Sequence, residues 1–178
     1  FVEFAISELE AQRKAYPTDI RAIAFLATIY ASARQPEQSL RVANDALALS
    51  PNRQQFYFIQ AENYLNLNQG DKAIEVLRKA RDLAPEYIEA TTNLATVLIL
   101  AGKDGEAEAL LEKQYGMKFM ADAHYAQAYT QRGELDKAAI VWKLLVDESP
   151  NSAENHANYG AVLARLGRNT EAIHEIEE

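Results

Sequence analysis

Small side chains recur at a fixed interval along the whole chain. In one series the interval is thirty-four positions, except for a single interval of thirty-one, and all but one of the members are alanine: Ala5, Ser39, Ala73, Ala107, Ala138 and Ala172. A second series keeps the same interval, and a large side chain follows each member three positions later. Its members are Ala27, Ala61, Ala95, Ala126 and Gly160. Small residues let two helix backbones approach while large ones fill the neighbouring space, so the pattern predicts pairs of closely packed helices.

Prolines divide the chain at the same interval. Pro17, Pro51 and Pro85 are evenly spaced by it, and each follows an alanine-rich stretch. Because proline disrupts a helix interior, each one marks the end of a helix pair. No segment alternates apolar and polar residues with a period of two, so we expect no sheet. The predicted elements are a single helix at about 1–16 and helix pairs at about 20–49, 54–83, 88–115, 119–148 and 153–178.

A short turn is predicted inside each helix pair. The turns are marked by Gln35-Pro36, Gly70-Asp71, Gly102-Lys103, Arg132-Gly133 and Gly167-Arg168. In the last four we expect glycine to adopt the left-handed conformation that ends a helix. Pro36 stands instead where the next helix begins, because the first helical residue does not need its N–H.

The order of residues within each unit resembles the tetratricopeptide repeat. The unit from Gln54 to Tyr87 shows it best, with the turn Asn68-Gln69-Gly70-Asp71 and with Tyr57, Ala61, Tyr64, Ala73, Leu77, Ala80 and Pro85. The resemblance implies an all-α fold, a right-handed α-solenoid (superhelix) of antiparallel helix-turn-helix units. A single array then covers the chain, with a half repeat at 1–19, full repeats at 20–53, 54–87, 88–118 and 119–152, and a partial repeat at 153–178.

One unit is shorter than the others. The single short interval falls between Ala107 and Ala138, and Gly116 stands one full interval before Pro150, where a further proline is missing. We therefore expect the helix that ends near Tyr115 to be about one turn shorter than its equivalents. The linker that follows is apolar. We expect its three large residues to pack back into the structure, and an exposed binding loop is the alternative. They are Met117, Phe119 and Met120.

Composition limits the classes of function. The chain has 178 residues, 48% of them hydrophobic, and a net charge of −8, which argues against nucleic-acid binding. With no cysteine there is no disulfide and no thiolate metal site. The longest apolar run, near Leu94 to Ala101, is too short to cross a bilayer, and the first residue is Phe1. We expect a soluble segment of a longer protein, cytoplasmic or attached to a membrane protein.

The sequence offers no catalytic constellation. His174-Glu175 begins the pattern of a zinc protease helix, but Glu178 stands where the second histidine is needed. His156 falls at a packing position, and His124 is a lone histidine that serves better as a hydrogen-bonding group than as a base. No glycine-rich phosphate loop or nucleophile elbow is present. We predict that the protein is not an enzyme and has no catalytic residues, no metal site and no cofactor.

The family resemblance implies that the first helix of each pair lines a concave groove. Carried onto this sequence, the groove positions predict these partner-binding residues: Phe25, Thr28, Phe58, Ile59, Glu62, Thr92, Asn93, Thr96, Met120, His124 and Gln127. The equivalent positions near the end of the chain include Thr130, Asn158 and Ala161. Phe25, Phe58 and Ile59 are candidate anchors for a partner. The alternative is that these three residues only pack against the preceding helices.

The groove residues also bear on the kind of partner. Family members that grip the acidic C-terminal tails of chaperones place lysine, asparagine and arginine at five of these positions. Here those positions hold Ala24, Thr28, Ile59, Glu89 and Asn93. The resemblance therefore implies a non-catalytic protein–protein interaction scaffold. We expect it to bind an apolar or neutral peptide or helix of a partner protein, with no nucleic acid and no direct insertion into a membrane.

Two other functions remain open. Residues 97–104 and 133–144 are similar to the tetratricopeptide arrays of bacterial O-antigen-ligase-type membrane proteins, which would make this chain a soluble accessory domain for glycan assembly. The single helix at 1–16 and the last helix at the other end carry apolar residues without a predicted partner, which would suit a self-association module. A homo-oligomer formed through these terminal helices is the corresponding prediction.

Overall fold

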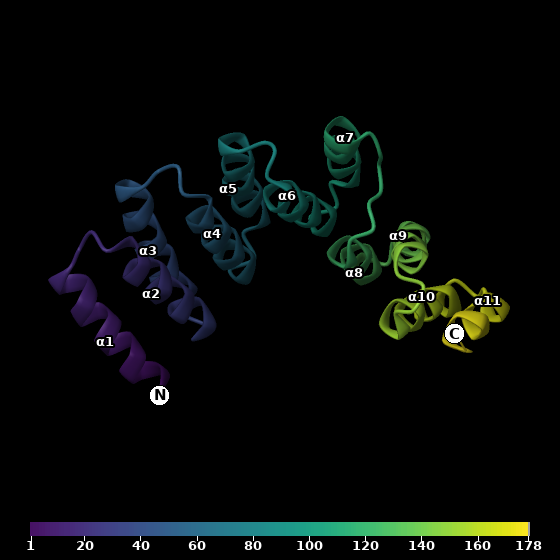
Figure 1. Cartoon of the computed structure of the whole chain (residues 1–178), viewed down its shortest axis with the longest axis horizontal. Coiled ribbons are helices and arrows are strands. Elements are labelled where there is room, and N and C mark those ends of the chain that lie inside the picture. Colours follow the sequence, from purple (N-terminus) through teal and green to yellow (C-terminus); the bar gives the residue numbers. More distant parts are fainter. Residues whose placement is uncertain (178) are drawn as a thin grey trace. The chain divides into compact units, whose positions relative to one another are not determined.

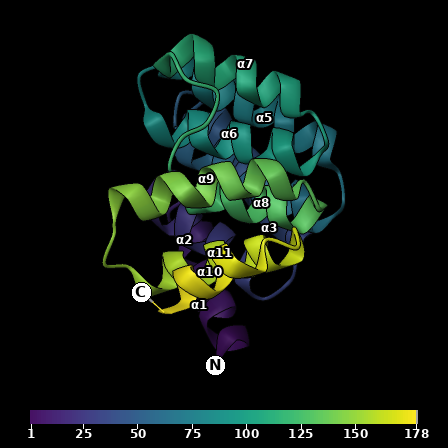
Figure 2. The same cartoon turned by 90° about the vertical axis from the view of Figure 1, so that its right-hand side faces the viewer.

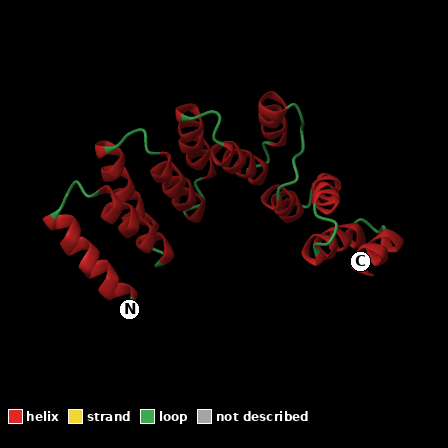
Figure 3. Ribbon diagram, viewed as in Figure 1, coloured by secondary structure: helices red, strands yellow, loops and turns green. Residues whose placement is uncertain are grey.

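The protein is entirely helical in the part of the chain that the structure describes, residues 1–177 of a computed structural model (Figures 1 and 3). Residues 1–177 form eleven helices and no strand. The helices are α1 (Val2–Ala15), α2 (Ile20–Ser32), α3 (Pro36–Leu49), α4 (Gln54–Asn66), α5 (Gly70–Leu83), α6 (Ile88–Leu100), α7 (Asp104–Tyr115), α8 (Ala123–Arg132), α9 (Leu135–Glu148), α10 (Ala153–Arg165) and α11 (Asn169–Glu177).

The chain divides into two compact units, Phe1–Ala90 and Thr91–Glu178, with the boundary in α6. In unit 1, helices that follow one another in sequence pack together from α1 to α5, and α2 also packs on α4. In unit 2, α8 packs on α9, α9 on α10 and α10 on α11, and Figure 2 shows these last helices against one another. Each unit therefore consists of stacked helix pairs, as the sequence predicts.

The recurring small residues lie where helices meet. Ala27, Ala61, Ala95, Ala126 and Gly160 are all buried. The first series is buried from its second member onward, and only Ala5 of α1 stays half-buried. In unit 1, Ala27 belongs to a core that also includes Leu26, Val42 and Phe56. The spacing of small residues thus predicts the packing correctly.

Ser39, the one residue of the first series that is not alanine, carries a buried polar contact. Its hydroxyl donates to the backbone oxygen of Ala27 at 2.7 Å, and the amide of Asn63 donates to the Ser39 hydroxyl at 2.8 Å. The Asn63 amide also donates to the backbone oxygen of Ile59 at 2.7 Å. Because buried polar groups need partners, this chain of hydrogen bonds joins α2, α3 and α4 in a defined register.

Three of the four predicted glycine turns are correct and one is wrong. Gly102, Gly133 and Gly167 have φ of 76°, 78° and 77° in the left-handed region. Gly70 instead is the first residue of α5, and Asn68 takes the left-handed conformation with φ of 55°. Asparagine tolerates this region because its short polar side chain can bond locally, so the turn does not need glycine at Gly70.

Pro36 is the first residue of α3, as predicted. The turn before it contains Arg34, whose φ is 56°. Arg34 occupies the position in its repeat that Asn68 occupies in the next one, so the same turn conformation recurs with a different side chain.

In the shortened unit, α7 ends at Tyr115 as predicted, but its length and the start of α8 differ from the prediction. α7 has 12 residues where α3, α5 and α9 have 14, so it is shorter by about half a turn and not by a whole one. Gly116 ends it with a φ of 74°. α8 begins at Ala123 and not at 119, because Asp122 caps it by accepting a hydrogen bond from the His124 N–H at 2.8 Å.

The apolar linker between α7 and α8 packs only in part. The Phe119 and Tyr129 ring centroids lie 6.2 Å apart, and Phe119 and Met120 are half-buried. Met117 is 50% exposed, so the prediction that it packs back is wrong. The reason is its place directly after the left-handed Gly116, before the chain returns to the helices.

Candidate functional site

The predicted groove residues of unit 1 lie on two helices that contact each other. Phe25 and Thr28 are on α2, and Phe58, Ile59 and Glu62 are on α4. Phe25 is 57% exposed, Thr28 and Glu62 are also exposed, and Phe58 is half-buried. The Thr28 hydroxyl donates to the backbone oxygen of Ala24 at 3.1 Å. This contact occupies the hydroxyl hydrogen within its own helix.

Ile59 differs from the other candidate anchors. It is only 8% exposed and belongs to the hydrophobic core that contains Leu26 and Phe56. Ile59 therefore packs within the core, as the alternative to partner binding predicts, whereas more than half of the Phe25 side-chain surface is exposed. The two phenylalanines leave an apolar surface on unit 1 that a partner could cover.

The predicted groove residues of unit 2 lie in three places. Thr92, Asn93 and Thr96 are half-buried on α6. Met120 lies in the linker before α8 and not on a helix, since α8 begins at Ala123. On α8 itself, two predicted residues are exposed: His124 and Gln127.

His124 is tied to the cap of its own helix. Its Nδ1 lies 3.0 Å from the Oδ1 atom of Asp122, the same oxygen that accepts from the His124 N–H. The imidazole is largely exposed. This arrangement fits a hydrogen-bonding role at the helix start, and nothing in it activates the ring as a base.

A recess of about 430 Å³ opens between α8 and α10, with α9 behind it. It is lined by Gln127, Thr130, Gln131, Trp142, Asn158, Ala161, Val162 and Arg165. Four of these, Gln127, Thr130, Asn158 and Ala161, are groove positions that the sequence predicts. The structure thus brings together predicted residues from two successive units. The volume of the recess lies within the range of roughly 300–1,000 Å³ that is usual for ligand sites.

The sequence prediction missed the other four lining residues. Gln131 and Arg165 stand four residues after the predicted groove residues Gln127 and Ala161, so each lies on the same helix face one turn further on. Trp142 and Val162 are buried and form the apolar floor. Trp142 is the only tryptophan of the chain, and its rarity was the one available signal, but the family pattern places it on the second helix, away from the groove.

The chemistry of the recess is apolar at the bottom and neutral polar at the sides. Gln127, Gln131 and Asn158 offer side-chain amides, which can both donate and accept hydrogen bonds. The Thr130 hydroxyl donates to the backbone oxygen of Ala126 at 2.7 Å, which occupies its hydrogen. Arg165 is the one charged lining residue, and its Nη1 donates to the backbone oxygen of Thr130 at 3.4 Å.

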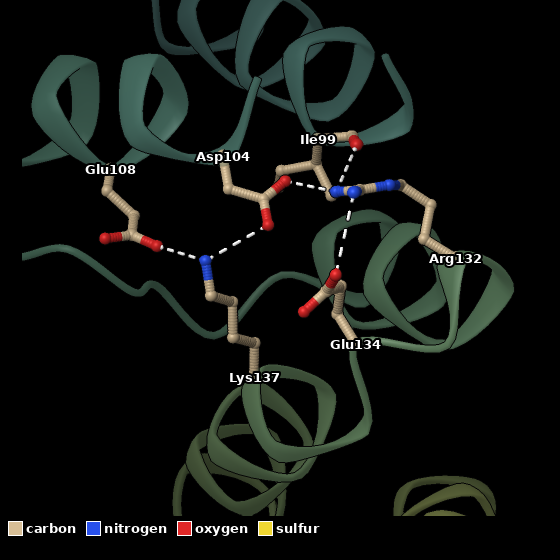
Figure 4. Close-up of polar contacts among 6 residues, drawn as sticks. All are labelled: Ile99, Asp104, Glu108, Arg132, Glu134 and Lys137. Carbon is tan, nitrogen blue, oxygen red and sulfur yellow. Dashed lines mark hydrogen bonds and ion pairs between the residues drawn. The ribbon is translucent and has the colours of Figure 1, made fainter. Parts of the chain in front are cut away.

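A separate ion-pair network joins α7, α8 and α9 (Figure 4). Asp104 accepts hydrogen bonds from Arg132 and, at 3.1 Å, from the ammonium group of Lys137. Lys137 also donates to Glu108 at 2.7 Å, and Arg132 donates to the backbone oxygen of Ile99 at 3.0 Å. Figure 4 shows that Lys137 and Arg132 approach Asp104 from different helices.

Two groups at the network, Lys137 and Tyr129, have raised pKa values. Hydrogen bonds from Lys137 to Glu108 and Asp104 raise the pKa of that lysine, so it stays charged. The ammonium lies 5.6 Å from the Tyr129 ring centroid. Burial raises the pKa of Tyr129 to about 12. Both shifts keep Lys137 charged and Tyr129 neutral near neutral pH, which fits a structural role of the network in positioning α8.

Within residues 1–177, no cluster of three or more histidine, cysteine, aspartate or glutamate residues could hold a metal ion. His156 is buried, with Nδ1 at 2.8 Å from Glu175 and Nε2 at 3.0 Å from the backbone oxygen of Pro150. In the same part of the chain, no helix combines the length and apolar character that spanning a membrane requires.

Residues 64–114 match the family model of the tetratricopeptide repeat. Residues 64–114 therefore resemble the tetratricopeptide repeat, and the chain has the fold of solved repeat proteins of this kind. The matched segment runs from the end of α4 to the end of α7, and the stacked helix pairs continue on both sides of it. No curated protein sequence matches the chain. Proteins of this family generally serve as interaction scaffolds and not as catalysts.

Solved tetratricopeptide repeat structures resemble the chain over most of its length. TTC0263 of Thermus thermophilus is 21% identical with a TM-score of 0.68, and the match covers 92% of this chain and 91% of that one. PilW, a type IV pilus biogenesis factor, is 18% identical with a TM-score of 0.73, covering 98% and 82%. YrrB, a repeat protein with an unusual peptide-binding site, is 18% identical with a TM-score of 0.60, covering 95% and 89%. The likeness shows the fold, an all-α helical repeat solenoid.

Proposed function

We propose that this repeat protein is a non-catalytic scaffold that binds a peptide segment of a partner protein in the recess between α8 and α10. The observation that carries the proposal is the recess itself, which combines predicted groove residues of two successive units over an apolar floor. YrrB, a structural relative, has a peptide-binding site, and the same class of ligand suits the recess described here.

The lining indicates how a peptide would be held. An apolar side chain of the partner fits over Trp142 and Val162, where its burial contributes about 25 cal/mol per Å² of apolar surface. The amides of Gln127 and Asn158 stand at the sides, where they can pair with the N–H and C=O groups of an extended main chain. Ala161 is small and keeps the recess open.

The partner is a neutral or apolar segment. The groove residues Thr28, Thr96 and Thr130 each donate their hydroxyl to a backbone oxygen four residues earlier, which leaves fewer donors for an acidic ligand. With a net charge of −8, the chain also repels nucleic acid. On unit 1, Phe25 and Phe58 supply a second apolar contact surface.

The test is to fill the recess without changing the fold. Peptides that bind the full chain are first selected from a random library of neutral 12-residue sequences. Their affinity for the parent protein and for Ala161→Trp is then measured by fluorescence anisotropy. We expect at least tenfold weaker binding, which corresponds to about 1.4 kcal/mol. Ala109→Trp, at an exposed position of α7, is the matched control and should bind the peptides as tightly as the parent does. Equal binding by both variants would place the peptide elsewhere.

A second candidate function, self-association, rests on exposed apolar side chains of the first and last helices. Phe1 and Phe4 of the N-terminal segment and Ile173 and Ile176 of α11 are all mostly exposed. Large exposed apolar residues at neighbouring positions are typical of surfaces that another chain covers. A second copy of this chain is the partner that these faces suggest.

A further inference from the structure

A second recess lies on unit 1, on the side of α4 that faces away from the predicted groove. Tyr57, Gln60 and Tyr64 line it from α4 at positions i, i+3 and i+7, which share one face of a helix. At about 100° per residue, this face lies roughly half a turn away from Phe58 and Glu62. The recess is therefore separate from the predicted groove of unit 1 and belongs to another surface of that unit.

Three helices enclose this recess, whose volume is about 430 Å³. Its lining residues are Asn44, Leu47, Tyr57, Gln60, Tyr64, Lys72, Glu75, Val76 and Lys79. Leu47 is half-buried and Val76 is buried, so the floor is partly apolar. The two tyrosine rings add further carbon surface. Methylene groups of a ligand side chain could pack here beside the polar groups.

The polar groups of the recess are held in place. Gln60 is 5% exposed, and its amide nitrogen donates to Asn44 Oδ1 at 2.6 Å. The bond fixes which end of the Asn44 side chain accepts, and leaves its amide nitrogen as a donor. The Tyr57 hydroxyl donates to the backbone oxygen of Pro51 at 2.8 Å. These contacts orient the rim before any ligand is present.

The charges leave one cation without a carboxylate. Lys79 donates to Glu75 at 2.7 Å, which neutralises that pair. The Lys72 ammonium lies 5.6 Å from the Tyr64 ring centroid, and across residues 1–177 Lys72 takes part in no ion pair. The recess thus holds two ammonium groups and one carboxylate, Glu75, and an anion that enters it can meet Lys72 and the Asn44 amide. Charge complementarity therefore selects an anionic ligand.

We propose that this recess binds an acidic side chain, glutamate or aspartate, of a partner polypeptide, independently of the peptide recess on unit 2. The carboxylate pairs with Lys72 and the Asn44 amide, while its methylene groups lie against Tyr57 and Tyr64. The apolar part of the lining favours a side chain over a free inorganic anion, since phosphate has nothing to place there. The protein then holds two partners, or two segments of one partner, one on each unit.

The peptide fluorescein-Gly-Glu-Glu-Glu-Gly-amide, labelled at its N-terminus, tests the proposal by fluorescence anisotropy with the full chain. We expect saturable binding that the glutamine analogue of the peptide does not show. Lys72→Gln should weaken it about fivefold, the upper range for a partly exposed ion pair. Lys118→Gln, which removes an exposed charge in the linker before α8, is the matched control and should leave binding unchanged.

Three results would overturn the proposal. The first is equal binding of the glutamate and glutamine peptides. The second is equal weakening by Lys72→Gln and Lys118→Gln, which would indicate a diffuse charge effect. The third is displacement of the peptide by inorganic phosphate at the same concentration. Ala161→Trp, which fills the other recess, should not affect this binding, so the two sites succeed or fail separately.

Discussion

At Gly160 the repeat needs a residue smaller than alanine. A Cβ added to Gly160 would lie 2.9 Å from the Ile176 Cγ1 and 3.1 Å from the backbone oxygen of Ala172. Ile176 can turn aside, but the carbonyl of Ala172 can move only with α11. The repeat series therefore has glycine at a position where α11 leaves little room for a Cβ atom.

Two glycine-to-alanine substitutions separate the effect of close helix packing at Gly160 from the general preference of helices for alanine over glycine. Gly105, in the first turn of α7, has open space around its missing side chain. Gly105→Ala should raise the free energy of unfolding by roughly 0.5–1 kcal/mol. Gly160→Ala should fail to give this gain, since the contact with Ala172 offsets it. Urea unfolding of both variants measures the difference, and an equal gain would show that α10 and α11 are not closely packed.

His156 is a residue whose charge the structure constrains. Both ring nitrogens face oxygen acceptors, the carboxylate of Glu175 and the backbone oxygen of Pro150. Only the protonated ring donates from both nitrogens. The contact of Nδ1 with Glu175 joins α10 to α11, and the contact of Nε2 joins α10 to the turn before it.

The contact between His156 and Glu175 should help to hold α11 in place. Glu175→Gln should weaken it, because the change replaces the carboxylate that faces Nδ1 with a neutral amide. Amide hydrogen exchange of α11 should show less protection in Glu175→Gln than in the parent, and equal protection in both proteins would contradict this role.

Among the elements, α8 shows what the sequence could and could not predict. Its place in the repeat follows from Ala126 and Tyr129, which stand at the positions where a small and a large residue recur in each unit. Its start at Ala123 depends on the Asp122 cap, which the repeat pattern does not contain. Its orientation depends on Arg132, whose partners lie 28 and 33 residues away in the sequence. Local spacing cannot reveal such contacts, because long side chains reach one another only after the helices are placed.

The ion-pair network should contribute measurably to stability. Arg132→Met removes the contacts of Arg132 with Asp104 and with the backbone oxygen of Ile99, both partly buried. We expect a loss of about 1–3 kcal/mol. Lys143→Met breaks an exposed pair with Asp147 and should cost at most about 0.5 kcal/mol. Chemical denaturation compares the two, and similar losses would mean that the network acts as an ordinary surface pair.

On the scale of the whole molecule, the protein consists of two compact units built from one repeated motif. In such arrays each repeat contacts its neighbours, and stability is close to a sum of local terms. The two sites that we propose are divided in the same way, with a recess for a neutral peptide on unit 2 and a recess for an acidic side chain on unit 1. Each site lies within one unit, so each can be tested by substitutions that leave the other unit unchanged.

The exposed apolar residues of the terminal helices predict association at high concentration. Phe4→Glu together with Ile176→Glu should shift the protein toward a monomer, because each change puts charge on an exposed apolar face. Sedimentation velocity over a range of concentrations measures the effect. A parent protein that remains monomeric throughout that range would exclude the self-association function.

The sequence by itself determined the repeat, the helix pairs and the small residues at their crossings, because helix geometry turns fixed spacing into fixed packing. Ala27 and Ala73 are buried where the pattern places them. Only the tertiary structure shows that Ile59 lies in the core, that Gly70 begins a helix and that Trp142 forms part of the floor of the recess. These outcomes depend on distances between side chains of different helices, which a repeat pattern leaves free.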